Sequence, residues 1–369
     1  MLRRLTSASL GDALREVCEL LEFAGIRDIL ACFDPLHPRH AHWVAARAAA
    51  PLEFQPLIDL FQLGGSATDR DLAVIPQNTL ETLRMEGLLK RTGGTNSWWL
   101  GGLVLMPVQG LWLLCHMNKP NPTLYFGDDS IGLALRLSAT PGQTVLDLCA
   151  GPGIQSLRSA QMGAWVTSVE VNPVAAALAR LNAAANGLSD LIEVRVGNLY
   201  DVLSNERFDR IVANPPLLPI PDDLPYPFVG HGGPDGLRIT RRIIEGLPER
   251  LNPRGNARLI GTTLSDGYLP LCLGDLEQMA QRLHLNVQMY ITAHHVLNDG
   301  AVYFEGLAAT CASTGDISGE AARATYRAFL DERGATHLCA YFLHIVIGEG
   351  RLELIDVAEE PSNDLWFTL

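Results

Sequence analysis

The segment Thr144-Val-Leu-Asp-Leu-Cys-Ala-Gly-Pro-Gly153 carries the strongest structural signal in this chain. Its apolar and β-branched start predicts a buried parallel strand, and the small residues after it predict a loop at the strand's carboxyl end. Gly151 and Gly153 lack a Cβ where backbone has to pass close to a ligand. A helix predicted from about residue 154 to 162 would offer free backbone N–H groups to that ligand. The segment therefore indicates a site for a nucleotide-like molecule.

Further strands follow in the order of a doubly wound fold. Residues 165–171 predict a second strand that ends in Glu170, roughly 20 residues beyond the glycines, where an acid commonly binds ribose hydroxyls. After a helix at 173–186, residues 191–196 and 208–213 predict the third and fourth strands. The fourth strand runs directly into Asn214-Pro215-Pro216-Leu217. A glycine turn alone also occurs in folds that bind nothing, so the acid and this second motif carry the functional prediction.

With these motifs in this order, the chain resembles the class I S-adenosylmethionine-dependent methyltransferases, in the branch with Asn-Pro-Pro after the fourth strand. That branch includes release-factor glutamine N-methyltransferases and some rRNA and DNA amino-methyltransferases. The resemblance spans residues 125–265 and includes Tyr125-Phe-Gly-Asp-Asp-Ser130 and Gly232-Gly-Pro-Asp-Gly-Leu237. It implies an α/β fold with a doubly wound, Rossmann-like sheet of seven strands, and S-adenosyl-L-methionine as cofactor.

The resemblance also implies a set of site residues. In the family, the Asn214 side chain and the Pro215 carbonyl accept hydrogen bonds from the acceptor's N–H groups, while the two prolines hold that carbonyl by fixing φ. Asn214, Pro215 and Pro216 are therefore the predicted catalytic residues. The predicted cofactor-binding residues are Tyr125, Asp147, Cys149, Ala150, Gly151, Gly153, Glu170, Val171, Asn198, Leu199 and Asn214.

Two positions depart from the family pattern. Leu217 replaces an aromatic residue that stacks on a planar amide or base, which weakens the prediction of a glutamine or nucleobase acceptor. Asn198 replaces an Asp that contacts the adenine amine, although its carbonyl oxygen still accepts from that amine. The proline-rich loop 218–233 follows, and we predict that Leu217, Tyr226, Phe228 and His231 line the acceptor pocket. If the acceptor is an oxygen or carbon atom, His231 or Asp128 is a candidate base.

The charge distribution bears on the partner. The formal net charge is −13, with 11 basic and 12 acidic residues up to residue 120, but 17 basic and 29 acidic residues after it. Proteins that bind RNA or DNA normally present a basic surface to the phosphates, and this sequence has no Lys/Arg-rich run. A nucleic-acid acceptor is therefore disfavoured, although not excluded.

Other compositional features indicate a cytoplasmic protein without a metal. The longest apolar stretch, residues 100–117, is interrupted by glycines, Pro107 and Gln109, so no membrane span is expected. Arg3 and Arg4 are soon followed by acids, unlike a secretory signal. The seven cysteines form no CxxC pair and are expected to be reduced. We interpret His37, His40 and His42 as part of a surface loop, because no set of ligands surrounds them.

The first 120 residues predict a mainly helical, winged-helix-like domain ahead of the methyltransferase domain at 121–369, with a linker at 118–122. Helices are predicted at 8–31, 36–50, 51–63, 68–72 and 77–87, and a hairpin at 88–100. The candidate recognition helix, Thr79–Glu86, has two acids and one arginine, which favours a substrate-covering or dimerising role over DNA binding. A homodimer is thus left open. Strand material is expected at 103–117.

The carboxyl-terminal part predicts a helix at 235–251, a strand at 257–263, a helix at 269–283 and a strand at 286–293. An insertion of about 40 residues, with a helix near 320–333, precedes closing strands at 337–347 and 351–357. Tyr303 and Phe304 of this insertion are further candidates to border the acceptor.

Three functional hypotheses follow. The first is a small-molecule methyltransferase of specialised metabolism, acting on nitrogen, which the acidic charge and Leu217 favour. The second is a protein glutamine or rRNA amino-methyltransferase, which the Gly232–Leu237 segment favours. The third is a non-catalytic protein that senses S-adenosylmethionine through a winged helix.

Overall fold

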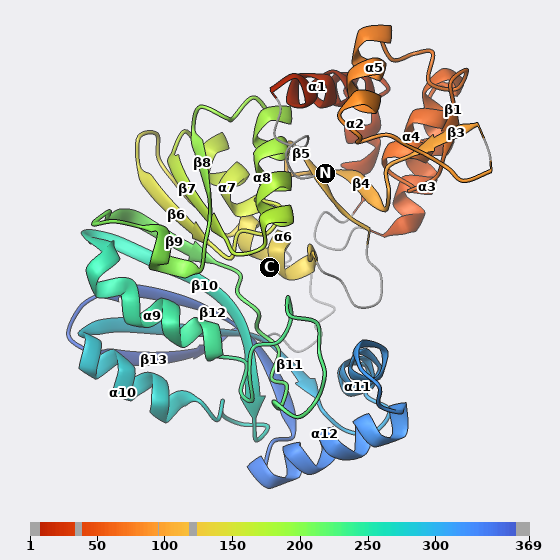
Figure 1. Ribbon diagram of the computed structural model, residues 1–369. Coiled ribbons are helices and arrows are strands. Elements are labelled where there is room, and N and C mark those ends of the chain that lie inside the picture. Colours follow the sequence, from red (N-terminus) through yellow and green to blue (C-terminus); the bar gives the residue numbers. More distant parts are fainter. Residues whose placement is uncertain (1–7, 34–38, 95, 118–123, 359–369) are drawn as a thin grey trace, which may run out of the picture. The chain divides into compact units, whose positions relative to one another are not determined.

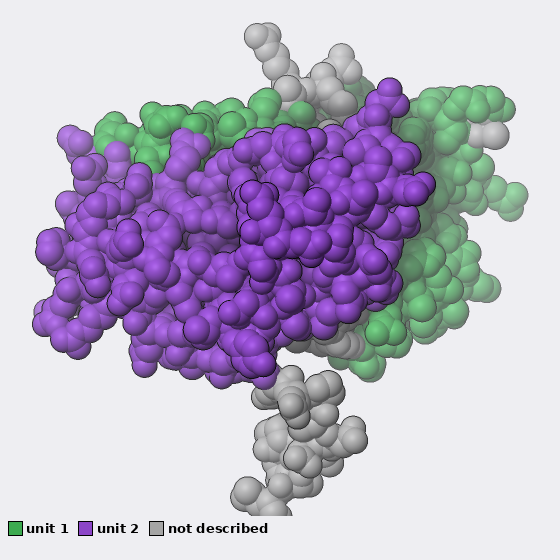
Figure 2. All heavy atoms as spheres, turned by 90° about the horizontal axis from the view of Figure 1, so that it is seen from below, with its two compact units in different colours: residues 1–119, 124–204 green, residues 120–123, 205–369 purple. Residues whose placement is uncertain are grey.

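The computed structural model describes residues 8–33, 39–94, 96–117 and 124–358 (Figure 1). The chain divides into two compact units: unit 1 comprises residues 1–119 and 124–204, and unit 2 comprises residues 120–123 and 205–369 (Figure 2). The boundary predicted at residue 120 and the linker predicted at 118–122 fall on residues 118–123, which lie outside the described ranges. The division into domains 1–120 and 121–369 stays a prediction.

A parallel three-stranded sheet with the order β6-β7-β8 forms the second half of unit 1. Its strands alternate with helices, as the sequence predicted. In chain order the elements are α6 (Asp128–Leu135), β6 (Thr144–Leu148), α7 (Ile154–Gln161), β7 (Trp165–Glu170), α8 (Pro173–Ala185), β8 (Ile192–Val196) and the short 3-10 helix η2 (Leu199–Val202).

Helix α8 follows from local chemistry. The Asn172 side chain accepts from the Val174 N–H at 2.9 Å and caps the helix, and Pro173 supplies a first residue with a suitable φ. Seven alanines favour helix formation, and their small side chains let neighbouring elements approach the helix closely. A Cβ on Gly11 would lie 2.3 Å from the Cβ of Ala184, so α1 (Ala8–Phe23) packs directly on α8. Small residues on both helices thus permit this close contact.

The first half of unit 1 is mainly helical, as predicted, with differences at the ends. The predicted helix 8–31 is interrupted at Gly25, whose φ of 75° begins a separate helix. The remaining helices are α2 (Ile26–Leu30), α3 (His40–Ala49), η1 (Leu52–Phe54), α4 (Gln55–Phe61) and α5 (Gln77–Met85). The helix predicted at 68–72 is wrong. Thr68 instead pairs with Ser97 as a strand, and its hydroxyl donates to the Asp71 carboxylate at 2.7 Å.

The predicted hairpin at 88–100 is present as part of a small antiparallel sheet with the order β1-β3-β2. Its strands are β1 (Ala67–Thr68), β2 (Lys90–Arg91) and β3 (Ser97–Trp99). Helix α5 followed by this hairpin reproduces the winged-helix-like arrangement. A second hairpin, β4 (Leu103–Val108) and β5 (Leu111–His116), accounts for the strand material predicted at 103–117.

Two asparagines of α8 hold strand β5. The Asn182 side chain accepts from the Leu114 N–H at 2.8 Å and donates to the Leu114 carbonyl at 3.0 Å. One turn later, Asn186 makes the same pair of bonds with Trp112 at 2.8 and 2.7 Å. A step of four residues toward the C-terminal end of α8, where Asn186 directly follows the helix, therefore matches a step of two residues back along the strand. Asn182, fully buried, also donates to the Pro152 carbonyl in the glycine loop at 2.9 Å.

We predict that Asn182→Ala lowers the free energy of unfolding by about 2 to 4 kcal/mol, because it leaves buried backbone groups of Leu114 and Pro152 without partners. Urea unfolding followed by circular dichroism measures the loss. Asn186→Ala is the matched control, and it should cost about 1 kcal/mol because Asn186 is itself half-buried and water can replace its side chain. Equal losses in the two variants would contradict a special role for Asn182.

Unit 2 contains five strands in the order β13-β11-β12-β10-β9. Strand β12 is antiparallel to both β10 and β11, and β13 is parallel to β11. The elements of this unit are β9 (Phe208–Ala213), α9 (Arg238–Arg250), β10 (Leu251–Ser265), α10 (Leu273–Leu283), β11 (Leu285–Val296), α11 (Val302–Thr314), α12 (Gly319–Arg333), β12 (His337–Ile347) and β13 (Arg351–Asp356).

The α/β, Rossmann-like fold class is confirmed. The resemblance implied a sheet of seven strands. The strands β6 to β8 and the strands of unit 2 number one more than that among the described residues, and the additional strand is β13, which pairs with β11. Strand β10 begins at Leu251 rather than near 257, since Leu251 already pairs with Phe208 before an irregularity in the register. No helix within the described ranges is both long and apolar enough to cross a membrane.

Candidate functional site

The carboxyl ends of β6, β7 and β8 place the predicted cofactor-binding residues of unit 1 side by side. The parallel register pairs Leu148 with Val169 and Glu170 with Val196. The Gly197 N–H donates to the Glu170 carbonyl at 3.0 Å and extends this register past the strand end. The glycine loop, Glu170 and Asn198 therefore follow three adjacent strands at the edge where parallel sheets bind their ligands.

The two glycines of the loop serve different purposes. A Cβ on Gly153, where φ is 91°, would lie 3.1 Å from the Ala179 Cβ, so this glycine lets α7 and α8 pack closely. A Cβ on Gly151, where φ is 56°, would meet only the Tyr125 carbonyl oxygen, at 3.7 Å. The space over Gly151 is open, as a close approach of a ligand requires. Cys149 also has a positive φ, of 57°, which shows how sharply the chain turns after β6.

Glu170 joins the loop to the second strand. One carboxylate oxygen accepts from the Gly151 N–H at 2.8 Å, and the other accepts from the Asn172 N–H at 2.7 Å. Burial raises the pKa of Glu170, and the backbone donors of Asn172 and Gly151 oppose that shift. Each oxygen keeps a further lone pair, so the carboxylate suits the two hydroxyls of a ribose. This donor and acceptor set fits the nucleoside of the cofactor implied by the resemblance.

We predict that Glu170→Gln lowers the affinity for S-adenosylmethionine about 10-fold to 100-fold, because a carboxamide has one acceptor oxygen for two backbone donors and the ribose. Isothermal titration calorimetry measures the change. Glu193→Gln is the control, because Glu193 lies on the neighbouring strand and pairs only with Arg195 on the surface. An unchanged affinity in Glu170→Gln would exclude this role.

Asp147 lies within β6 and is buried. Its Oδ2 accepts from the Ser156 hydroxyl in the first turn of α7 at 2.6 Å, which ties the strand to the helix across the glycine loop. Its Oδ1 is buried without a hydrogen-bond partner among the described residues. Burial, with a smaller contribution from the charge of Glu170, raises the pKa of Asp147 from 3.8 to about 7. The unpartnered oxygen is an acceptor available to a bound ligand.

The raised pKa of Asp147 predicts a pH-dependent stability. Between about pH 4 and pH 7 the folded chain binds a proton at Asp147 that the unfolded chain has lost, so this group destabilises the fold progressively as pH rises. Asp147→Asn cannot ionise, and its stability relative to the wild type should rise between pH 5 and pH 8 by about 2 to 3 kcal/mol. Urea unfolding of both proteins without cofactor at pH 5 and pH 8 measures the difference. A constant difference would refute the shifted pKa.

The remaining predicted residues of unit 1 surround this edge. Asn198 is the residue before η2, and Leu199 follows it with a φ of 51°. Val171 is 45% exposed and directly follows Glu170, while Ala150 is buried. The Tyr125 hydroxyl donates to Asp129 at 2.7 Å in the first turn of α6, while its carbonyl faces Gly151. Unit 1 thus brings together the predicted cofactor-binding residues except Asn214.

Unit 2 holds the Asn-Pro-Pro motif in a supported turn after β9. The Leu217 carbonyl accepts from the Thr262 hydroxyl at 2.7 Å. A Cβ on Gly236 would lie 2.6 Å from the same carbonyl oxygen, and a Cβ on Gly232 would lie 2.7 Å from its carbon. The glycines of the Gly232–Leu237 segment are therefore needed for close contact with the end of the motif. This contact explains why the two motifs occur together.

The loop after the motif is held by backbone hydrogen bonds within it and by contacts with helices α11 and α12. Leu218 donates to Gly230 and accepts from Gly232, both at 2.9 Å. The buried Tyr326 of α12 donates to the Pro219 carbonyl at 3.1 Å. Phe304 is fully buried in the same apolar cluster, so it supports the loop and does not present its ring to solvent.

The predicted acceptor-lining residues differ in their surroundings. Tyr226 is half-buried against the cluster of α11 and α12, and burial raises its pKa to about 12. His231 accepts from the Gly233 N–H at 3.2 Å, and burial, together with Arg238, lowers its pKa. Phe228 is 65% exposed, and Tyr303 stacks on His295. The described residues contain no cluster of three His, Cys, Asp or Glu that would bind a metal, and His37 lies outside them.

Two contributors were not predicted from the sequence. Asn182 binds the glycine-loop carbonyl of Pro152, and Ser156 binds Asp147. A fully buried asparagine in an alanine-rich helix is a detectable signal, because buried amides need partners. Its partner at Leu114 lies 68 residues away, and no local pattern identifies it.

Comparisons with known proteins agree with this geometry. The methyltransferase small-domain family model matches residues 129–282. The ribosomal protein uL3 glutamine methyltransferase of Bradyrhizobium diazoefficiens is 31% identical over 36% of this chain and 44% of its own length. A putative protein N5-glutamine methyltransferase of Methanocaldococcus jannaschii is 30% identical over 44% of this chain and 81% of its own length.

A third relative has another kind of acceptor in its name. The tRNA1(Val) (adenine(37)-N6)-methyltransferase of Porphyromonas gingivalis is 36% identical over 32% of this chain and 49% of its own length. The chain thus spans about half the length of this relative and of the uL3 enzyme, and most of the Methanocaldococcus protein. None of the three names includes a small-molecule acceptor.

Proposed function

Because the chain belongs to the class I S-adenosylmethionine-dependent methyltransferases of the small-domain branch, we propose that it methylates the carboxamide nitrogen of a glutamine side chain in a protein. The segment Asn214-Pro215-Pro216-Leu217 carries this proposal, because the family resemblance assigns acceptor binding to its amide oxygen and carbonyl, and contacts at Leu217 support the end of the segment. Two relatives named for glutamine methylation support the choice of acceptor. The proposal replaces the small-molecule acceptor favoured by the sequence.

S-adenosylmethionine, the cofactor, supplies an electrophilic methyl group. During transfer a bond forms between the acceptor nitrogen and the methyl carbon, the carbon–sulfur bond breaks, and the nitrogen loses a proton to solvent. The Asn214 side chain and the Pro215 carbonyl accept hydrogen bonds from the carboxamide NH₂ and keep its nitrogen aligned. Pro216 restricts the turn, because its ring fixes φ and removes a competing N–H.

A small-molecule acceptor remains the second candidate, and Leu217 is the observation that favours it. An aliphatic side chain at this position cannot stack on a planar carboxamide as an aromatic ring would. A small amine with an apolar body would pack equally well against leucine. Location in the cytoplasm and formation of a homodimer also stay predictions.

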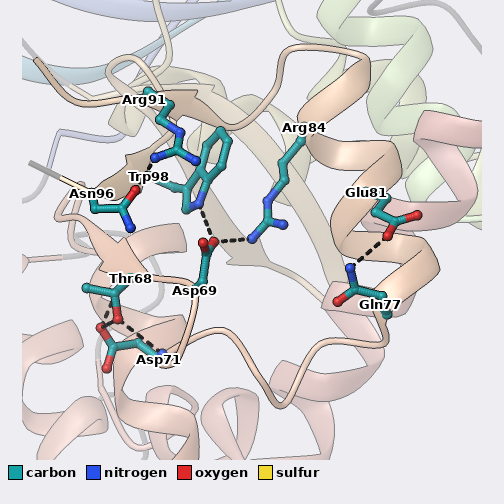
Figure 3. A network of polar contacts seen from close by, with 9 residues as sticks. All are labelled: Thr68, Asp69, Asp71, Gln77, Glu81, Arg84, Arg91, Asn96 and Trp98. Carbon is teal, nitrogen blue, oxygen red and sulfur yellow. Dashed lines mark hydrogen bonds and ion pairs between the residues drawn. The ribbon is translucent and has the colours of Figure 1, made fainter.

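The winged-helix part of unit 1 argues against the DNA-sensing hypothesis. Two of its arginines are engaged internally: Arg84 forms an ion pair with Asp69, and both Arg84 and Arg91 lie over the Trp98 ring, at 4.6 and 4.7 Å (Figure 3). The Trp98 indole N–H donates to Asp69 at 2.6 Å (Figure 3). These cations would have to leave an acid and an aromatic ring before they could bind phosphates.

Incorporation of label tests the proposal directly. We expect that the full chain, incubated with methyl-labelled S-adenosylmethionine and a fractionated cell extract, labels protein, and that acid hydrolysis releases the label as methylamine. Label confined to small molecules would support the second candidate and overturn the first. Label in RNA would replace the carboxamide acceptor with a nucleobase amine.

Asn214→Ala should lower turnover at least about 100-fold, because an aligned acceptor depends on its side-chain oxygen. The affinity for S-adenosylmethionine should stay within a few-fold, as measured by calorimetry. Asn252→Ala is the control, since Asn252 bonds only to Asp209 in the same unit and should keep normal turnover. Normal turnover in Asn214→Ala would exclude the assigned role.

A further inference from the structure

Unit 1 contains a cavity of about 200 Å³ close to the glycine loop. It is lined by residues of α3, the residue after α4, strand β4, the end of β5 and the start of α6, elements that are labelled in Figure 1. Phe126 forms part of its wall and directly follows Tyr125, whose carbonyl oxygen faces Gly151. The cavity wall is therefore only one residue in sequence from a contact with the glycine loop.

The cavity has an unusual polar group in its wall. Gln62 is 5% exposed, and neither its Oε1 nor its Nε2 has a hydrogen-bond partner among the described residues. The Trp43 Nε1, from the same lining, is also buried without a described partner. Burying a carboxamide without partners is unfavourable, so such a group usually binds a ligand or water. Two donors and one acceptor are thus available to an occupant.

The other wall residues restrict the chemistry of that occupant. Val104, Met106, Phe126 and Ile131 supply an apolar surface. The described lining also includes the imidazoles of His40 and His116, but no lysine or arginine. The carboxylate in the lining, Asp128, disfavours an anion. The volume is below that of sites that enclose a whole drug-sized molecule. A neutral group the size of one side chain, with a carbonyl oxygen and an N–H on one edge, satisfies each of these conditions.

We propose that this cavity is an acceptor subsite that binds a neutral carboxamide side chain of the protein substrate, through paired hydrogen bonds with Gln62. The proposal rests on the proposed function, because it takes the acceptor to be a protein. The Gln62 NH₂ and the Trp43 N–H donate to the carbonyl oxygen of the ligand, and the Gln62 oxygen accepts from its N–H. The helical part of unit 1 then selects the substrate, and does more than cover the cofactor.

Binding of a capped amino acid tests the subsite. The probe is N-acetylglutamine N-methylamide, titrated into the full chain with S-adenosylhomocysteine present and followed by NMR. We expect Gln62→Leu to weaken binding of this probe about tenfold or more, which corresponds to the loss of one or two neutral hydrogen bonds. The capped glutamate and leucine analogues should bind the wild type no more tightly than the glutamine probe binds Gln62→Leu. Equal binding of the leucine analogue would overturn the proposal.

The chain offers a matched control for the same substitution. Gln109, in the turn between β4 and β5, also has a buried side-chain amide without a described partner, but it does not line the cavity. Gln109→Leu should bind the probe like the wild type. Both substitutions replace an unpartnered buried amide with a carbon side chain, so both proteins should melt at or above the wild-type temperature. Folding failure therefore does not explain a loss of binding in Gln62→Leu.

The labelling assay separates this proposal from the proposed function. If the wild type and Gln62→Leu label protein with the same KM for the labelled substrate, the methyltransferase function stands and the subsite is wrong. If no protein is labelled but the glutamine probe binds with the expected dependence on Gln62, the carboxamide site stands and its protein substrate is wrong. A raised KM in Gln62→Leu, with cofactor affinity unchanged, supports both.

Discussion

The side-chain amide of Asn182 is the contact on which the arrangement of unit 1 most depends. It satisfies three backbone groups, two on β5 and one in the glycine loop. Buried backbone groups need partners, and Asn182 itself is fully buried, so neither side can move without losing hydrogen bonds. The close packing of Gly11 on Ala184 adds a second restraint on the same helix. The helical region and the glycine loop therefore behave as one structural unit, which ends at Ser204.

This restraint has a consequence for the site. The glycine loop is held on two sides, by Asn182 through Pro152 and by Glu170 through the Gly151 N–H. A loop positioned in this way binds its ligand without first having to order itself, and less binding energy is lost. In unit 2 the equivalent restraint acts on the Asn-Pro-Pro turn, where the Thr262 hydroxyl and two glycines hold the Leu217 carbonyl. Each half of the chemistry thus rests on a turn with fixed backbone positions.

How much the sequence predicts depends on the range of the interaction. Strand β9 was located to the residue, and β6 was found within the predicted stretch 144–153, because an apolar run followed by glycine or proline is a local signal. The predicted helix at 68–72 failed, because the pairing of Thr68 with Ser97 across the chain outweighs local propensity. Three contributors were not identified from the sequence. Asn182 acts through residues distant in sequence, Ser156 acts on Asp147 across the glycine loop, and Gln62 is marked only by a missing partner. The sequence favoured a small-molecule acceptor, whereas the named relatives favour a protein or tRNA acceptor, because net charge describes the whole surface and recognition depends on a few side chains.

Two of the unsatisfied polar groups in unit 1 lie where ligands are expected. The Asp147 Oδ1 lies behind the glycine loop, and the Gln62 amide lies in the wall of the neighbouring cavity. Each costs folding free energy that an apolar or fully bonded side chain would not cost. By linkage, a ligand that satisfies them stabilises the folded chain in proportion to its affinity. Cofactor and acceptor should therefore complete the packing of this unit as well as react within it.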